Sequence, residues 1–119
     1  MTCVDDTLRL ESTMGPATQQ ETCVERIKRS VTEVERLLAP DVVRIRYEIT
    51  TNWNDEPAIY FRAILSDEAV STKARLVQNY GRVKDELDNR LDFEGMGLAR
   101  YHHVRSVSEQ AVLKEEAWA

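Results

Sequence analysis

The sequence predicts an α+β fold: a two-layer α-β-β-α-β sandwich with two helices on one face of a three-stranded sheet, plus a short C-terminal helix. Two patterns predict it. Apolar residues recur every three or four positions in two long segments, and every second position in the segments that follow them. The chain has 119 residues, of which 42% are hydrophobic and 31% charged, enough for one domain and too few for two. We expect a mobile arm over 1–17, a single domain over 18–107 and an acidic tail helix over 108–119.

The first helix is expected to begin after residue 17. Thr18 and Glu21 have the spacing of a capping box, in which their side chains satisfy free amides at a helix start. The segment that follows carries one apolar stripe, formed by Val24, Ile27, Val31, Val34 and Leu38. Pro40 is predicted to end this helix, because proline does not fit a helix interior.

Two strands joined by a hairpin are expected over residues 43–65. From residue 43 the period is two, with Val43, Ile45, Tyr47 and Ile49 alternating with polar residues. Residues 52–57 are rich in turn formers. Residues 58–65 then supply a second alternating segment, so the two strands are predicted to pair and to bury the same face.

A second helix is expected to start at Ser66 or Asp67 and to run to about Leu91. Its inner stripe is Val70, Val77, Tyr80, Val83, Leu87 and Leu91. Gly81 in its middle predicts a kink or a close contact with the sheet, since glycine destabilises an exposed helix by about 1 kcal/mol relative to alanine. A loop over 92–97 and a third strand over 98–107 complete the predicted sheet.

The polar sides of the predicted strands form an open sheet face directed away from the helices. It would present Arg44, Arg46, Glu48, Thr50, Tyr60, Arg62 and Ile64. Within this set, three arginines and one tyrosine form a basic patch that can stack a nucleobase or anchor a protein: Arg44, Arg46, Tyr60 and Arg62. A solvated face with cross-strand pairs between arginine and glutamate is at least as good an interpretation.

Two tryptophans are candidates for a partner-binding site. Trp53 is expected in the hairpin loop, and Trp118 in the tail near Glu115 and Glu116. Tryptophan at such positions often anchors an interface. Trp118 can equally fold back to close an open end of its own core.

No catalytic or metal-binding constellation is evident, so we expect neither an enzyme nor a cofactor. His102 and His103, the only histidines, are neighbours in a strand and point to opposite faces, so they cannot hold one metal ion together. Cys3 and Cys23 do not form a C-x-x-C pair and are expected to stay reduced. A nucleophilic pair of Cys23 and His103 lacks an identifiable third group.

The net charge of −5 lies mainly in the two flanks of the chain. Residues 1–40 contain five basic and seven acidic side chains, residues 41–107 ten and eleven, and residues 108–119 one and three. An acidic surface repels phosphate backbones and favours a basic protein partner. No segment is apolar enough to cross a membrane and no secretory signal is visible, so we expect a cytoplasmic protein.

Residues 58–91 resemble the second strand and the long helix of the ribosome-binding factor A family. The matching stretches are AIYFRAILSDE at 58–68 and LVQNYGRVKDEL at 76–87, and Gly81 lies where that family has a break in its helix. The resemblance implies a type II KH-like fold and RNA binding. The same topology is similar to that of the cytoplasmic C-terminal domains of cation diffusion facilitators, which implies a homodimer.

The function we expect is a small non-catalytic protein that acts through a protein partner, such as the neutralising, antitoxin-like subunit of a bacterial two-component system. The acidic flanks favour it, as does a tail whose Trp118 could dock into a basic groove. The alternative is a KH-like RNA-binding or ribosome-assembly factor that uses the arginines and Tyr60 of the sheet face. An enzyme or metal site around His102 or His103 is a third hypothesis, and self-association through the sheet face is compatible with each.

Overall fold

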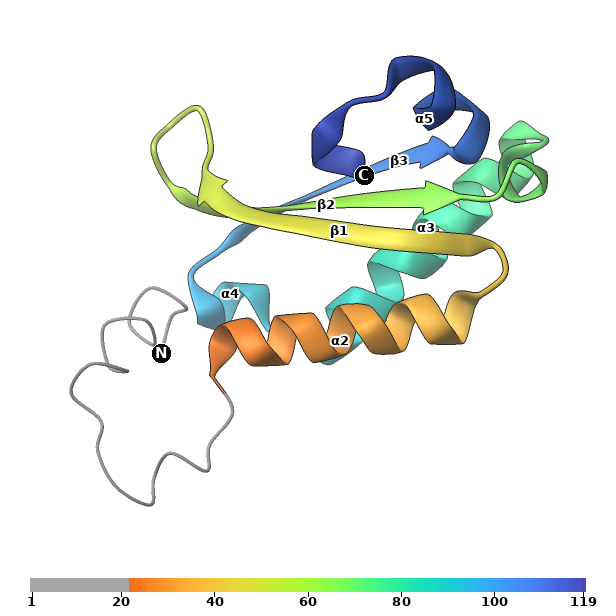
Figure 1. Ribbon diagram of the computed structural model, residues 1–119. Coiled ribbons are helices and arrows are strands. Elements are labelled where there is room, and N and C mark those ends of the chain that lie inside the picture. Colours follow the sequence, from red (N-terminus) through yellow and green to blue (C-terminus); the bar gives the residue numbers. More distant parts are fainter. Residues whose placement is uncertain (1–21) are drawn as a thin grey trace.

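The computed structural model describes residues 22–119, so the expected arm over 1–17 and the expected capping box at Thr18 lie outside the described residues. The described chain is α+β, in the predicted order α-β-β-α-β with a short C-terminal helix. Strand β1 (Val42–Thr51) pairs antiparallel with β2 (Pro57–Leu65), and β2 pairs parallel with β3 (Ala99–Ser106). Helices α2 (Cys23–Leu38) and α3 (Lys73–Arg90) lie on one face of this sheet (Figure 1). The predicted fold class is confirmed.

Helix α2 begins at a threonine cap. The Oγ1 atom of Thr22 accepts a hydrogen bond from the backbone N–H of Glu25 at 3.1 Å. The buried side of the helix consists of Cys23, Ile27, Ser30, Val31, Val34 and Leu38, and the predicted stripe residue Val24 is exposed. Cys23 is disulfide-bonded as well as buried, so the expectation of a reduced thiol is wrong.

Strand β1 contains one register irregularity, between Val42 and Arg44. Val42 is buried, whereas Val43 is 51% exposed, because the extra residue of a β-bulge shifts the alternation by one position. Val42 therefore takes the inward position predicted for Val43. Glu35 of α2 accepts a hydrogen bond from the N–H of Ile45 at 2.7 Å, which satisfies a donor of this edge strand and hinders its pairing with another chain.

The predicted second helix is divided into two elements. A 3-10 turn, η2 (Glu68–Val70), comes first, and α3 begins only at Lys73. Its cap is Thr72 instead of Ser66 or Asp67, because Thr72 has extended backbone and its Oγ1 accepts from the N–H of Arg75 at 3.1 Å.

A buried asparagine joins the two elements. The Nδ2 atom of Asn79 donates to the carbonyl oxygen of Ala69 at 2.8 Å, and both residues are buried. Val77, which was predicted on the inner stripe, is exposed, since Asn79 and Val83 face inward instead. Periodicity in apolar residues alone does not reveal a polar residue on the inner side.

Gly81 has no close neighbour. A Cβ atom at this position would meet nothing within 4 Å, so the predicted close contact between helix and sheet is wrong.

We expect Gly81→Ala to stabilise the protein by about 0.5–1 kcal/mol, because alanine loses less backbone entropy in a helix and has free space here. Chemical denaturation of both proteins measures this difference in unfolding free energy. A destabilised variant would show that α3 needs glycine at residue 81 for a reason other than space.

The segment predicted as a loop before β3 contains a short helix, α4 (Phe93–Met96). Asp92 caps it by accepting from the N–H of Gly95 at 3.0 Å, and Gly97 ends it with a φ of 73°. The turn is helical because Phe93 and Met96 bury their side chains in the core.

The expected tail helix over 108–119 is shorter than predicted. Helix α5 (Val107–Leu113) starts from a capping box of Ser106 and Glu109, and a 3-10 turn, η3 (Glu116–Trp118), follows it. Both elements lie on the side of the sheet away from α2 and α3 (Figure 1). The sheet face that was predicted to be open is therefore partly covered.

Candidate binding surface on the outer sheet face

The outer face of the sheet, which is directed away from α2 and α3, is built by the alternation of the three strands. Residues opposite each other in neighbouring strands lie on the same face, and the register pairs Arg46 with Arg62, Tyr60 with Tyr101, and Ile64 with Arg105. The outer face thus carries Arg44, Arg46, Glu48, Tyr60, Arg62, Ile64, Tyr101, His103 and Arg105. The predicted grouping of the arginines of β1 and β2 with Tyr60 agrees with this register.

Four aromatic rings gather at one end of the outer face, and we call them the aromatic cluster: Trp53, Tyr60, Tyr101 and His103. The rings of Tyr60 and Tyr101 stack with centroids 4.9 Å apart and an interplanar angle of 20°. Trp53 lies on one side of this pair, with its ring centroid 5.7 Å from that of Tyr101. His103 lies on the other side, with its ring centroid 6.4 Å from that of Tyr60. Trp53 is 77% exposed, so the cluster presents apolar area to its surroundings.

The hairpin loop that carries Trp53 is held by one asparagine. The Oδ1 atom of Asn52 accepts from the N–H groups of Asn54 and Glu56 at 2.8 and 3.1 Å. Its Nδ2 atom donates to the hydroxyl of Tyr101 at 3.3 Å, which links the loop to β3. Because Asn52 is buried and bonded both to the loop and to β3, the backbone of the loop that carries Trp53 is fixed relative to the sheet.

The arginines of β1 and β2 are largely engaged within the chain. Arg62 lies 3.1 Å from the carboxylate of Glu48, and its guanidinium carbon is 6.0 Å from the ring centroid of Tyr60. The Nε atom of Arg46 donates to the backbone oxygen of Ala119. Arg44 is half-buried on the same face. The cross-strand pairing of arginine with glutamate, one of the two interpretations of this face, is therefore present at Arg62.

The other end of the outer face is covered by residues 115–119, which we call the docked segment. Trp118 in this segment is only 6% exposed, and the guanidinium carbon of Arg105 lies 4.3 Å from its ring centroid. Arg105 also pairs with the carboxylate of Glu115 at 2.7 Å. The turn η3 contacts β2, where the outward side chain of Ile64 is also 6% exposed.

Trp118 is therefore not an exposed anchor. Of the two predicted alternatives, folding back onto its own domain is the one the structure has, although the ring covers the outer sheet face instead of an open end of the core. Glu116 is exposed, and Glu115 is engaged by Arg105. Trp53 is the tryptophan that remains accessible.

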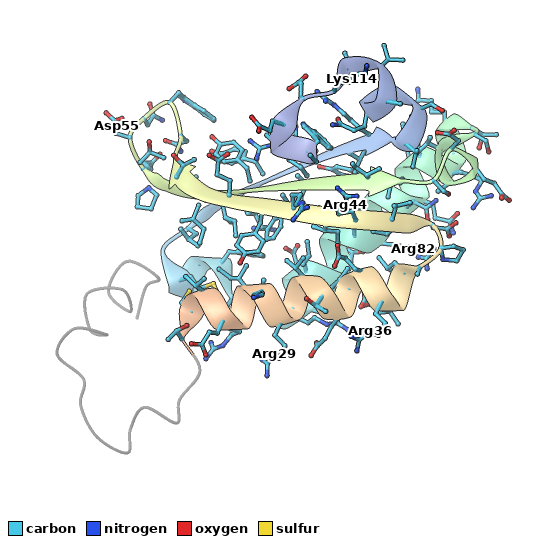
Figure 2. The ribbon with its side chains drawn as sticks, in the orientation of Figure 1. Arg29, Arg36, Arg44, Asp55, Arg82 and Lys114 are labelled. Carbon is cyan, nitrogen blue, oxygen red and sulfur yellow. The ribbon has the colours of Figure 1, made fainter. Side chains whose placement is uncertain are left out.

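Two turns with positive φ flank the uncovered part of this face. Asp55 in the hairpin has a φ of 59° and Lys114 after α5 a φ of 51°. Both turns rise on the side of the sheet away from α2 (Figure 2). The aromatic cluster lies near the first turn, and the docked segment follows the second.

The two histidines point to opposite faces, as predicted. His103 is exposed beside Tyr60, whereas the ring of His102 stacks on Phe61 with centroids 5.2 Å apart. Burial lowers the pKa of His102 to about 4, so the ring is neutral at pH 7. Neither of its ring nitrogens has a hydrogen-bond partner within residues 22–119, and over that range no group of three or more potential ligands could hold a metal ion.

Comparisons with known proteins do not assign this chain to a family. No protein-family model matches the chain, and neither the curated proteins nor the solved structures show a significant similarity to it. No helix of the described part of the chain is long and apolar enough to cross a membrane.

Three residues of this surface were not predicted to lie on it: Tyr101, His103 and Arg105. The alternation of β3 is obscured in the sequence because Arg100 and His102 occupy inward positions. Arg100 can do so because its guanidinium pairs with Asp88 at 2.8 Å and lies over the ring of Phe93. In the sequence, placing His102 on the inner face would have put Tyr101, His103 and Arg105 on the outer face, because residues of a strand alternate between its two faces.

Proposed function

We propose that this chain works by binding a protein partner through the outer face of its sheet. The observation that carries the proposal is the aromatic cluster, with the exposed Trp53 beside the stacked pair of Tyr60 and Tyr101. Tryptophan, tyrosine and arginine dominate the binding energy of protein interfaces. The loop is held by Asn52, so little conformational entropy is lost when Trp53 enters a partner's pocket.

RNA is the second candidate ligand, and the stacked pair of Tyr60 and Tyr101 is the observation that favours it, since nucleobases stack on such platforms. Binding of a phosphate backbone depends on free cations that release counterions from it. Arg62 is neutralised by Glu48, and both Arg46 and Arg105 are bonded to residues 115–119, so few such cations are free while that segment covers the face. The balance of charge on this face therefore favours a protein.

The wider role predicted from the sequence extends this proposal. A neutralising, antitoxin-like subunit needs one tight protein interface, and the aromatic cluster is where we place it. A homodimer through the same outer face is also compatible with this proposal, and Glu35 hinders the alternative of pairing along the edge of β1. A cytoplasmic location and a KH-like relationship remain proposals that we draw from the sequence.

The test is quantitative recovery of partners on the tagged full-length chain in its native host. Trp53→Ala is expected to reduce the recovered protein to less than about a tenth, because losing a hot spot of about 2 kcal/mol weakens binding about 30-fold. Val112→Ala is the matched control, since Val112 is 80% exposed on α5, outside the cluster.

Two results would contradict the proposal. Equal recovery by Trp53→Ala and the wild type would remove the aromatic cluster from the interface. The ligand would instead be RNA if nuclease treatment abolished the recovery, and if recovery fell steeply with salt and on changing Arg44 and Arg46 to glutamate.

A further inference from the structure

The docked segment is an intramolecular occupant of the outer face, and its chemistry indicates what else that face can bind. Residues 115–119 read Glu-Glu-Ala-Trp-Ala, a short acidic stretch with one tryptophan. Each of its main features has a specific contact on the sheet. The guanidinium of Arg105 lies over the ring of Trp118 and pairs with the carboxylate of Glu115. The Nε atom of Arg46 donates a hydrogen bond to the backbone oxygen of Ala119.

Few polar contacts other than these attach the segment to the domain. Helix α5, which precedes it, has no buried residue, and its apolar side chains Val107, Val112 and Leu113 are exposed. The link between α5 and η3 is Lys114, whose positive φ is unfavourable for a residue with a side chain. Beyond the contacts of Arg105 and Arg46, the polar link to α5 is an exposed hydrogen bond from Gln110 to the oxygen of Glu115 at 2.8 Å.

Cations concentrate around the position that the segment occupies. Arg46, Arg62 and Arg105 lie on the outer face, and within residues 22–119 the acidic side chains beside them are Glu48 of the sheet and those of the segment itself. The segment therefore supplies negative charge that the sheet lacks. Removing it would leave Arg105 without its carboxylate and Ile64 without its cover.

We propose that the outer face is a docking site for an acidic peptide segment that carries a tryptophan, and that residues 115–119 occupy this site in competition with a partner's segment. The inference rests on the proposed function, in that the same face binds protein, and it names the partner's chemistry. The partner's tryptophan takes the place of Trp118 under Arg105, and its carboxylate pairs with the same guanidinium. The net acidity of the chain favoured a basic partner, whereas the local charge at this site favours an acidic one.

The competition has a thermodynamic consequence. A site that is filled intramolecularly for more than about 90% of the time binds an added peptide at least about tenfold more weakly than the same site left empty. Loosening the segment is therefore expected to raise the affinity for a peptide added in solution.

The experiment uses a fluorescently labelled peptide with the sequence of residues 114–119, titrated against the full-length chain by fluorescence anisotropy. Trp118→Ala is expected to lower the apparent Kd for this peptide at least tenfold relative to the wild type, and adding Arg105→Ala is expected to abolish the gain. Glu115→Ala removes only a surface ion pair, so it leaves the core intact, and we expect an intermediate gain from it. Circular dichroism of each variant verifies its fold.

Matched peptides test the chemistry. A peptide with alanine in place of tryptophan is expected to bind at least about tenfold more weakly. A peptide with glutamines in place of the glutamates is expected to bind more weakly by up to about fivefold, the range for partly exposed ion pairs. Equal binding of the peptide by the wild type and both loosened variants would overturn the proposal, as would undiminished binding of the glutamine peptide. A wild-type chain that sediments as a dimer, and as a monomer after Trp118→Ala, would overturn it in favour of a second copy.

Failure of this proposal is distinguishable from failure of the proposed function. The peptide titration depends on Arg105 and not on Trp53, and it needs no native partner. Loss of partner recovery with Trp53→Ala, together with no peptide binding, would retain the protein interface and reject the docking site. Peptide binding, together with unchanged partner recovery by Trp53→Ala, would retain the docking site and reject the aromatic cluster as the protein interface.

Discussion

Replacing Phe61 by alanine is expected to lower the free energy of unfolding by about 3–5 kcal/mol, the range for removing a buried phenylalanine ring. Phe61 lies in the central strand β2 and is 1% exposed. Its ring contacts Phe93 edge to face at 5.8 Å and stacks on His102 at 5.2 Å. The side chain therefore joins β2 to α4 and to β3, and its loss leaves a cavity that neither neighbour can fill.

Urea denaturation, followed by circular dichroism, measures this loss. Phe61→Leu is the matched control, because leucine keeps most of the apolar volume and is expected to cost less than alanine. A domain of this size has a total stability of about 5–15 kcal/mol, so Phe61→Ala brings it close to unfolding. A cost below about 1 kcal/mol would mean that the packing around Phe61 is not the centre of the core.

The sequence predicts the fold well because the apolar pattern is strong where the chain packs on itself. Ile45, Tyr47 and the alternate residues of β2 are inward as expected, and Ile27, Val31 and Val34 form the inner side of α2. The errors occur where one residue disrupts the period. The bulge at Val43 shifts the start of β1, and Thr72 takes the cap of α3 from Ser66 and Asp67.

The candidate site was less predictable, because it depends on contacts between distant segments. The arginines and Tyr60 could be placed on one face by alternation in two adjacent strands. That Trp53 would meet Tyr101 requires the parallel pairing of β2 with β3 and the bend of the hairpin loop. The position of Trp118 under Arg105 depends on how the tail folds. The tail is too short for a periodic pattern of apolar residues to predict its fold.

The second large effect concerns pH. We expect the protein to lose stability as the pH falls from about 6.5 to about 4, through His102. Burial of this ring is the main cause of its lowered pKa of about 4; the charge of Asp88 opposes the shift, and the charges of Arg100, Lys84 and His103 add to it. Between these two pH values the unfolded chain binds a proton at His102 and the folded chain does not, so acidification favours unfolding.

The size of this effect follows from the shift in pKa. A difference of one pKa unit corresponds to about 1.4 kcal/mol, and the effect is reduced because the ring is only partly buried, which leaves an expected loss of about 2 kcal/mol. Carboxylates titrate near the lower end of the same range, so the wild type alone does not isolate the contribution of His102. A variant that keeps the ring and removes its nitrogens does isolate it.

His102→Phe is that variant. Phenylalanine retains the stack on Phe61, and it removes two buried nitrogens that have no hydrogen-bond partner among the described residues, so the variant is expected to be at least as stable as the wild type at pH 7. Its advantage over the wild type is expected to grow by about 2 kcal/mol between pH 6.5 and pH 4. His103→Phe, on the exposed opposite face, is the matched control and should retain most of the pH dependence of the wild type, because burial of His102 and not the charge of His103 is the main cause of the shift. If urea denaturation gives parallel pH profiles for His102→Phe and the wild type, the burial of a neutral His102 is not what couples stability to pH.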